Sequence, residues 1–171
     1  INNPRGKLMY HIELIGLLGT LVTGIDNPNI EQMVRETLPL DEVVSHLLLT
    51  DLPTPLRANY LRLLDEAYLV TAKPLINDLA TDDFVELLVS LEARIAAFVA
   101  RVDAADDVDL EDGETQEAQE AEAEASFLLD DVLPMITHFF APHASLGETG
   151  VGGLAAAVIS QLAGYDDARE E

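Results

Sequence analysis

Apolar side chains recur every three or four residues along most of this chain, the spacing of one face of an α-helix. Long helices are predicted near residues 8–23, 54–70, 81–101 and 126–141, with shorter helices between them. The alternation of apolar and polar positions that is typical of a β-strand does not occur in the sequence. The pattern therefore predicts an all-α protein of about seven or eight helices. Its rhythm suits an armadillo-like α-solenoid, whose repeats run to ~40–47 residues.

Proline marks the predicted helix boundaries. Asn27-Pro28 and Thr54-Pro55 each combine a polar capping residue with proline at the first helical position, so a helix is expected to begin at each. Pro39 restarts the chain before a predicted helix at 40–49. Pro134 interrupts an apolar run and is expected to kink or restart the last long helix.

Residues 103–125 break the apolar pattern. This stretch contains eleven acidic residues and no basic ones. Such a charge run predicts a solvated, disordered loop that grades into a helix near Glu117. We expect residues 1–171 to form a single helical domain, a fragment of a larger protein because it begins at Ile1 rather than Met, with 103–125 as an acidic low-complexity loop. A final Ala-rich helix is predicted at 154–162.

The core is expected to consist of aliphatic side chains, because aromatic residues make up 5% of the chain and Trp is absent. The aromatic residues present are predicted to anchor that core. A neighbouring pair at the end of the last long helix has an alternative interpretation, in which it docks another domain from an exposed position. These residues are Tyr10, Tyr60, Tyr68, Phe84, Phe98, Phe127 and the pair Phe139-Phe140.

The formal net charge of −23 restricts the possible partners. A surface of this sign repels nucleic-acid phosphates and anionic lipid headgroups, whereas a basic protein or a divalent cation suits it. Because cysteine is absent, disulfides, thiol catalysis and thiolate metal sites are excluded. The longest apolar stretch, residues 14–22, is shorter than the roughly 20 residues that span a bilayer.

None of the candidate metal motifs has the required spacing. A calcium-binding EF-hand loop that begins at Asp107 has Asp112 where glycine is needed and Ala118 where a bidentate glutamate is needed. A diffuse cation site in the acidic stretch remains an alternative to a solvated linker. His138 and His143, with Asp130 and Asp131 nearby, have the wrong spacing for two ligands on one helical turn, and we expect no metal there.

No enzymatic or cofactor motif is recognisable. The glycine-rich segment at 147–153 lacks the Lys-Ser/Thr pair that grips phosphate, and no strand precedes it. His11, beside Tyr10 in an apolar helix, is expected to be a packed and hydrogen-bonded residue. The sequence therefore predicts a non-enzymatic protein without a cofactor.

Between Leu8 and Tyr68, three segments follow one another in a recognisable order: a Tyr-His helix, a Leu-Pro-Leu-Asp-Glu-Val-Val turn, and a helix with two tyrosines. In this order and spacing they resemble the helical homology domain shared by inositol trisphosphate receptors and ryanodine receptors, the intracellular calcium-release channels. The resemblance continues at 82–99 and at 132–140. The residues that carry it are Tyr10, His11, Glu13, Leu38, Pro39, Leu40, Asp41, Tyr60 and Tyr68.

The resemblance implies a segment of the large cytosolic region of such a channel, with the inositol trisphosphate receptor branch favoured. It implies a mechanical role, in which packed helices relay ligand-induced movement and dock neighbouring domains. The implied partners are other domains and subunits of the same channel, a homotetramer in this family, together with regulatory proteins. The implied location is the cytosolic side of a calcium-store membrane such as the endoplasmic reticulum. No ligand-binding residue is carried over, so the motif residues mark the fold.

Two other classes of function remain open from the residues alone. One is a separate armadillo-type adaptor whose acidic face binds basic peptides, which the net charge and the helical rhythm favour. The other is an acidic calcium buffer that binds the ion through residues 103–125.

Overall fold

The computed structural model describes residues 4–23, 28–70, 81–105 and 116–140, and these residues are helical apart from short connections. The α-helices are α1 (Pro4–Val22), α2 (Pro28–Thr37), α3 (Leu40–Leu47), α4 (Thr54–Leu64), α6 (Asp82–Ala105), α7 (Gln116–Ser126) and α8 (Leu133–Phe140). Two π-helical segments interrupt them, η1 (Asp65–Leu69) and η2 (Phe127–Val132). The predicted all-α class is confirmed, with no strand in the described ranges.

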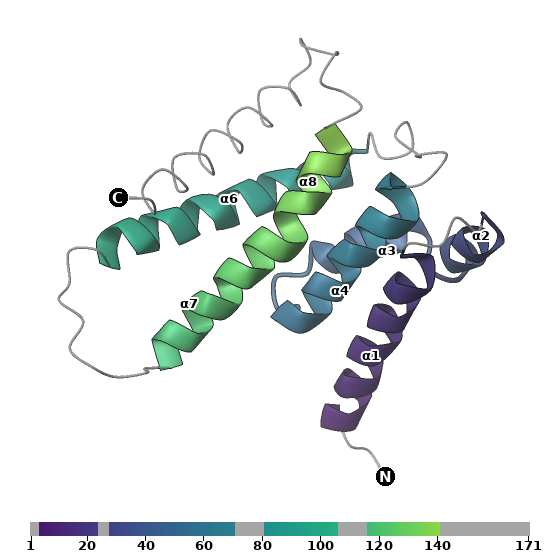
Figure 1. Ribbon diagram of the computed structural model, residues 1–171, viewed down its shortest axis with the longest axis horizontal. Coiled ribbons are helices and arrows are strands. Elements are labelled where there is room, and N and C mark those ends of the chain that lie inside the picture. The colour runs from purple at the N-terminus through teal and green to yellow at the C-terminus, as the bar shows by residue number, and fades with distance from the viewer. Residues whose placement is uncertain (1–3, 24–27, 71–80, 106–115, 141–171) are drawn as a thin grey trace.

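The helices are arranged around α4 and its continuation η1 (Figure 1). On different sides α4 contacts α1, α3 and the η2–α8 end of the last long helix. The α2 helix contacts α1 and η1, and α6 packs against α3. The segment α7–η2–α8 runs as one long ribbon beside α4 in Figure 1. Residues far apart in the sequence, in α1, η1 and α8, are thereby brought to the same region.

The helix starts predicted at Pro28, after Pro39 and at Thr54 are confirmed, but Thr54 is the first residue of α4 rather than its cap, which is Pro53. Helix α2 begins at Pro28, and α4 carries Pro55 in its first turn, where the missing N–H costs no hydrogen bond. Pro39 is the N-cap of α3, with an extended backbone (φ −60°, ψ 155°). Helix ends were predicted less well, because α3 stops at Leu47 and α6 continues to Ala105.

Both π-helical segments are closed by hydrogen bonds that span five residues. The Val70 N–H donates to the Asp65 carbonyl at 2.8 Å, and the Leu133 N–H donates to the Leu128 carbonyl. In a regular helix the Pro134 ring would clash with the carbonyl four residues earlier. The wider turns of η2 precede this proline, so the change of helix type falls where the sequence predicted a kink or restart.

The acidic segment is helical at both of its ends: the helix expected near Glu117 is confirmed, whereas the loop bounds of 103–125 are too wide. Residues 103–105 continue α6, and α7 occupies 116–126. Glutamate and alanine both have high helix propensity, so the alternating Glu and Ala residues are compatible with a helix that begins at Gln116. The stretch between, and the Ala-rich helix expected at 154–162, lie outside the described residues.

One continuous cluster of aliphatic and aromatic side chains forms the core. One face of α6 is buried, including Leu87, Leu91 and Ile95. Most of the aromatic anchors are buried too, and Phe139 packs against Phe84 with ring centroids 4.9 Å apart. The core interpretation therefore holds for Phe139. It is wrong for Tyr10, which is 68% exposed because it lies on the face of α1 that points away from α4.

Candidate functional site

Four of the residues that carry the family resemblance form contacts around α4 and η1: His11, Leu38, Tyr60 and Tyr68. The Tyr60 hydroxyl and His11 Nε2 are hydrogen-bonded at 2.9 Å, which joins α1 to α4 and confirms that His11 is a packed residue. The His46 ring stacks on Tyr60, with centroids 5.0 Å apart. The Tyr68 hydroxyl donates to the Leu38 carbonyl at 2.6 Å, which joins η1 to the chain before α3. Residues from three separate stretches thus form one packed set.

The remaining motif residues have different environments. Leu38 and Leu40 are half-buried against the core, and Pro39 caps α3. Asp41 is exposed in the first turn of α3, where a negative charge interacts favourably with the helix dipole. Glu13 is exposed on α1 and lines a cleft. Glu13 and Asp41 are therefore surface residues rather than parts of the buried set.

A cleft of about 770 Å³ opens between α1, the α4–η1 junction and the η2–α8 helix. Acidic side chains dominate its lining, opposed by one arginine and one histidine: the acidic residues are Glu13, Asp65, Glu66, Asp130 and Asp131, and the others are Arg62 and His138. Residues of both π-helical segments line the cleft. Because π-helical turns are frequently found at functional sites, the cleft is the candidate site.

Two polar pairs cross the cleft. His138 Nδ1 lies 2.8 and 2.9 Å from the two carboxylate oxygens of Asp65, which links α8 to η1. Arg62 Nε donates to the carboxylate of Asp131, which links α4 to η2. Both aspartates are buried, so their charges depend on these partners.

Burial sets the protonation behaviour of the cleft. Desolvation raises the pKa of Asp65, and the hydrogen bond and charge of His138 offset this only in part. The pKa of Asp131 is also raised by burial, against the opposing effect of Arg62. Burial and the neighbouring Asp65 raise the pKa of Glu66. These three carboxyls therefore hold a proton more firmly than solvated carboxyls do.

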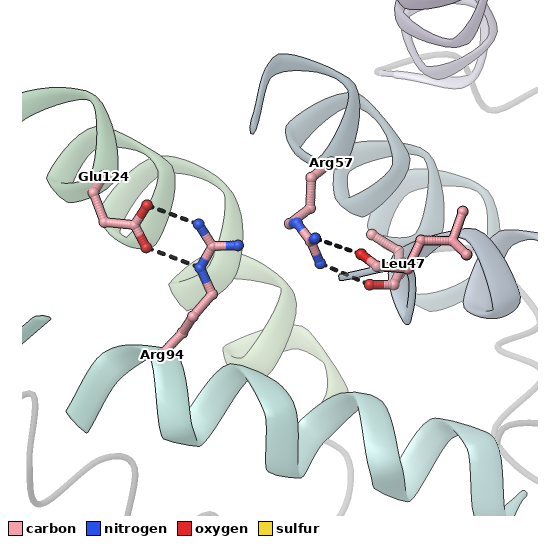
Figure 2. Close-up of polar contacts among 5 residues, drawn as sticks. Leu47, Arg57, Arg94 and Glu124 are labelled. Carbon is pink, nitrogen blue, oxygen red and sulfur yellow. Dashed lines mark hydrogen bonds and ion pairs between the residues drawn. The ribbon is translucent and has the colours of Figure 1, made fainter. Parts of the chain in front are cut away.

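A second polar network lies within the interior, and Figure 2 shows it. Two nitrogens of Arg94 donate to the two carboxylate oxygens of Glu124 at 2.9 and 2.7 Å. This bidentate pair joins α6 to α7 and lowers the pKa of Glu124. Arg57 Nη1 and Nη2 donate to the carbonyls of Leu47 and Leu49, each at 2.7 Å. Arg57 thereby caps the C-terminus of α3, so this network has a structural role.

The metal-site hypotheses are decided only in part. No group of three or more His, Asp or Glu residues within the described ranges is placed to hold a metal ion. Two members of the His-Asp cluster considered from the sequence are engaged elsewhere. Asp131 accepts a hydrogen bond from Arg62, and His138 is hydrogen-bonded to Asp65. His143 and the acidic stretch around Asp107 lie outside the described residues.

The polar pairs of the cleft were not found from the sequence. Arg62 and Asp131 are 69 residues apart, and Asp65 and His138 are 73 apart. No helical periodicity relates residues at such separations. The available signal was local, because Asp65-Glu66 and Asp130-Asp131 are acidic pairs flanked by apolar residues.

Comparisons with known proteins assign the chain to no family. No protein-family model matches it, and no curated protein matches it. None of the helices in the described ranges combines the length and the apolar character that crossing a bilayer requires.

Proposed function

We propose that this chain is a cytosolic helical segment of an inositol trisphosphate receptor-like calcium-release channel, where it acts as a conformational relay and docking scaffold. The observation that supports it is that four of the motif residues, His11, Leu38, Tyr60 and Tyr68, pair with one another around α4 and η1. The His11–Tyr60 and Tyr68–Leu38 hydrogen bonds join segments that the resemblance selected without regard to structure. A motif whose members hold one another in place is expected of a shared domain.

The proposed relay follows the packing of the helices. Movement of α1 would pass to α4 through the His11–Tyr60 contact. It would continue along α4 into η1 and reach α8 through the Asp65–His138 pair. Rigid helices in contact can carry such coupling when they have two arrangements that both ends bias. We include in the proposal that these helices form a repeat unit of an armadillo-like α-solenoid, which packs against further repeats of the parent protein.

The coding sequence on both sides of this segment gives the first test. The channel proposal expects a basic ligand-binding region upstream and about six apolar spans downstream, each of roughly 20 residues. A reading frame that ends soon after Glu171 without any span would overturn it.

A functional test uses the complete channel in store vesicles. Tyr60→Phe removes the hydroxyl that joins α4 to His11, while Val89→Ala at an exposed position on α6 serves as the control. We expect Tyr60→Phe to shift the ligand concentration for half-maximal calcium release about three- to tenfold, a coupling change of about 1 kcal/mol. Ligand binding should be unchanged. Equal calcium release in both variants would argue against a relay through α1 and α4.

The acid-lined cleft favours a second candidate, a separate armadillo-type adaptor that binds basic peptides. Five acidic residues line the cleft, against one arginine and one histidine, so its charge suits a cationic ligand. The same coding-sequence test separates the two candidates, because an adaptor requires no membrane region.

A further inference from the structure

One face of α1 is apolar and has no partner among the described residues. Tyr10, Leu14 and Leu17 follow one another at the spacing of a single helical stripe. Their exposed fractions are 68%, 38% and 56%, although the opposite face of the same helix is packed against α4. Single exposed apolar residues need no explanation, but a stripe of three on one helix has the form of a docking face.

This stripe leads directly into the cleft. Leu17 belongs to both, and Glu13, Gly16 and Thr20 of the same helix line the cleft beside it. The opposite wall carries Glu66 of η1 and the aspartates of η2. The surface therefore has an apolar edge on α1 and an acidic wall a few side chains away.

The charges on the acidic wall are only partly neutralised inside the molecule. Arg62 and His138 are each engaged with one aspartate. Neither Glu13 nor Glu66 forms an ion pair with another described residue, and the exposed Asp130 accepts a hydrogen bond only from a serine hydroxyl, that of Ser126 at 2.7 Å. These carboxylates are available to a cationic ligand.

We propose that the stripe Tyr10–Leu14–Leu17 and the adjoining acidic cleft form one docking surface for a basic amphipathic helix of a partner protein. Apolar side chains of that helix pack on Leu14 and Leu17, and its Lys or Arg side chains enter the cleft toward Glu13, Glu66 and Asp130. The occupant follows from charge complementarity, since an apolar helix without basic residues would leave the acidic wall unpaired. A cleft of about 770 Å³ holds several side chains but not a whole helix, so the partner lies across its mouth.

This inference rests on the docking role proposed above and names its surface and ligand class. It concerns the isolated chain, so its failure would leave the channel proposal standing. Conversely, a reading frame without a membrane region would remove the channel and leave this surface untouched.

The test is titration calorimetry of the full 171-residue chain with a synthetic helical peptide that carries Lys on one face and Leu on the other. A peptide of the same composition in scrambled order is the first control, because a chain of net charge −23 attracts any polycation. We expect the ordered peptide to bind at least tenfold more tightly than the scrambled one at 0.15 M salt. Equal affinities would overturn the proposal.

Two pairs of variants locate the binding. Glu13→Gln with Asp130→Asn removes two exposed charges at the cleft, and Glu86→Gln with Glu122→Gln removes two exposed charges elsewhere. Leu17→Ser alters the stripe, whereas Val89→Ser alters a similarly exposed position on α6 (48%). We expect each variant at the surface to weaken binding about three- to tenfold and each control to change it less than twofold. Losses of equal size in variants and controls would overturn the proposal.

Circular dichroism of each variant shows whether the helices are retained. The two sets act independently, because the charge variants leave the stripe intact and the serine variants leave the charge intact. If one set unfolds the chain, the other still decides the proposal.

Discussion

At the scale of single residues, Arg57 has the most constrained position in the described structure. Its guanidinium is buried, and it satisfies two carbonyls at the end of α3 (Figure 2). Burial, together with the neighbouring Arg94, lowers the pKa of Arg57, and Glu124 partly offsets this. The charge is retained because the negative end of the α3 dipole and the two carbonyls stabilise it.

Arg57→Ala is expected to lower the free energy of unfolding by about 1–3 kcal/mol, since it removes the donor to the buried Leu47 carbonyl and one of the two donors to the Leu49 carbonyl. Urea denaturation measures this directly. The free energy of unfolding of Arg57→Lys should lie between those of Arg57→Ala and the wild type, because an ammonium lacks the planar fork that reaches both carbonyl oxygens. Arg5→Ala on the exposed start of α1 is the control, with an expected change within about 0.5 kcal/mol. An Arg57→Ala protein as stable as this control would refute the capping role.

Tyr68 and Tyr10 provide a matched pair of tyrosines. Tyr68→Phe removes the hydroxyl that donates to the Leu38 carbonyl at 2.6 Å and should cost about 1–2 kcal/mol. Tyr10→Phe removes an exposed hydroxyl on α1 and should leave the free energy of unfolding unchanged. Thermal or urea unfolding of both proteins checks the difference, and equal stabilities would show that the η1-to-Leu38 contact contributes nothing.

The same tyrosine predicts a loss of stability in alkali. Burial raises the pKa of Tyr68 to about 12, whereas an unfolded tyrosine titrates near 10. A group whose folded-state pKa is raised contributes stability that is complete below its unfolded pKa and is lost as the pH rises through the folded value. The free energy of unfolding should therefore fall between about pH 10 and 12. A fall of the same steepness in Tyr68→Phe would assign the effect to other groups.

At the scale of helices, the sequence predicted the existence of the elements better than their internal form. Proline signals placed the starts of α2, α3 and α4 correctly, because they act through local backbone geometry. The π-helical segments were not predicted. The pattern of apolar and polar residues is the same whether a turn is closed by a four-residue or a five-residue hydrogen bond. The cleft was missed for the same reason that its ion pairs were: it exists only where α1, η1 and α8 meet.

The contact between α1 and α4 depends on two glycines that differ in the space around them. A methyl group at Gly19 would meet the Leu63 backbone at an ordinary 3.8 Å, whereas one at Gly16 would lie 3.0 Å from the Asn59 amide nitrogen. That amide donates to the Ile12 carbonyl of α1 at 2.8 Å. The space at Gly16 is therefore limited by the Asn59 side chain, whereas at Gly19 the α4 backbone itself lies at van der Waals distance.

Alanine at these two positions should have different effects. Gly19→Ala is expected to raise the free energy of unfolding by about 0.5–1 kcal/mol through helix propensity alone. Gly16→Ala gains the same propensity but displaces Asn59 from its hydrogen bond, so its net change should be zero or negative. Paired urea denaturation curves measure the difference. If the Gly16 variant proved as stable as the Gly19 variant, the contact between Gly16 and the Asn59 amide would not contribute to stability.

At the scale of the whole molecule, the net charge of −23 and the buried carboxyls of the cleft both destabilise the folded state as the pH rises. The exposed carboxylates repel one another increasingly as they ionise, which opposes the compact state. The pKa values of Asp65, Glu66 and Asp131 are raised by burial, so the folded chain holds these protons more firmly than the unfolded chain does. Glu124 is the exception, because its hydrogen bonds with Arg94 lower its pKa.

These shifts determine the sign of the pH dependence. For carboxyls with raised pKa values, the contribution to stability is complete below their ordinary values near 4 and is lost as the pH rises through the folded values. Glu124 contributes oppositely, since its stabilisation is complete above its ordinary pKa and is lost as the pH falls through the lowered value. Glu124 acts below its ordinary pKa and the three raised carboxyls act above theirs, so the free energy of unfolding is expected to increase as the pH is lowered from 7.5 towards the ordinary carboxyl values.

Urea denaturation across this range, in 0.05 and 0.5 M NaCl, separates the two contributions. Salt screens the exposed carboxylates and should raise stability at pH 7.5, but it acts much less on the buried groups of the cleft. Glu66→Gln should therefore reduce the pH dependence that persists at high salt, while Glu122→Gln on the exposed face of α7 should leave it unchanged. A free energy of unfolding that stayed constant or fell as the pH was lowered would mean that the cleft carboxyls are solvated and ionised.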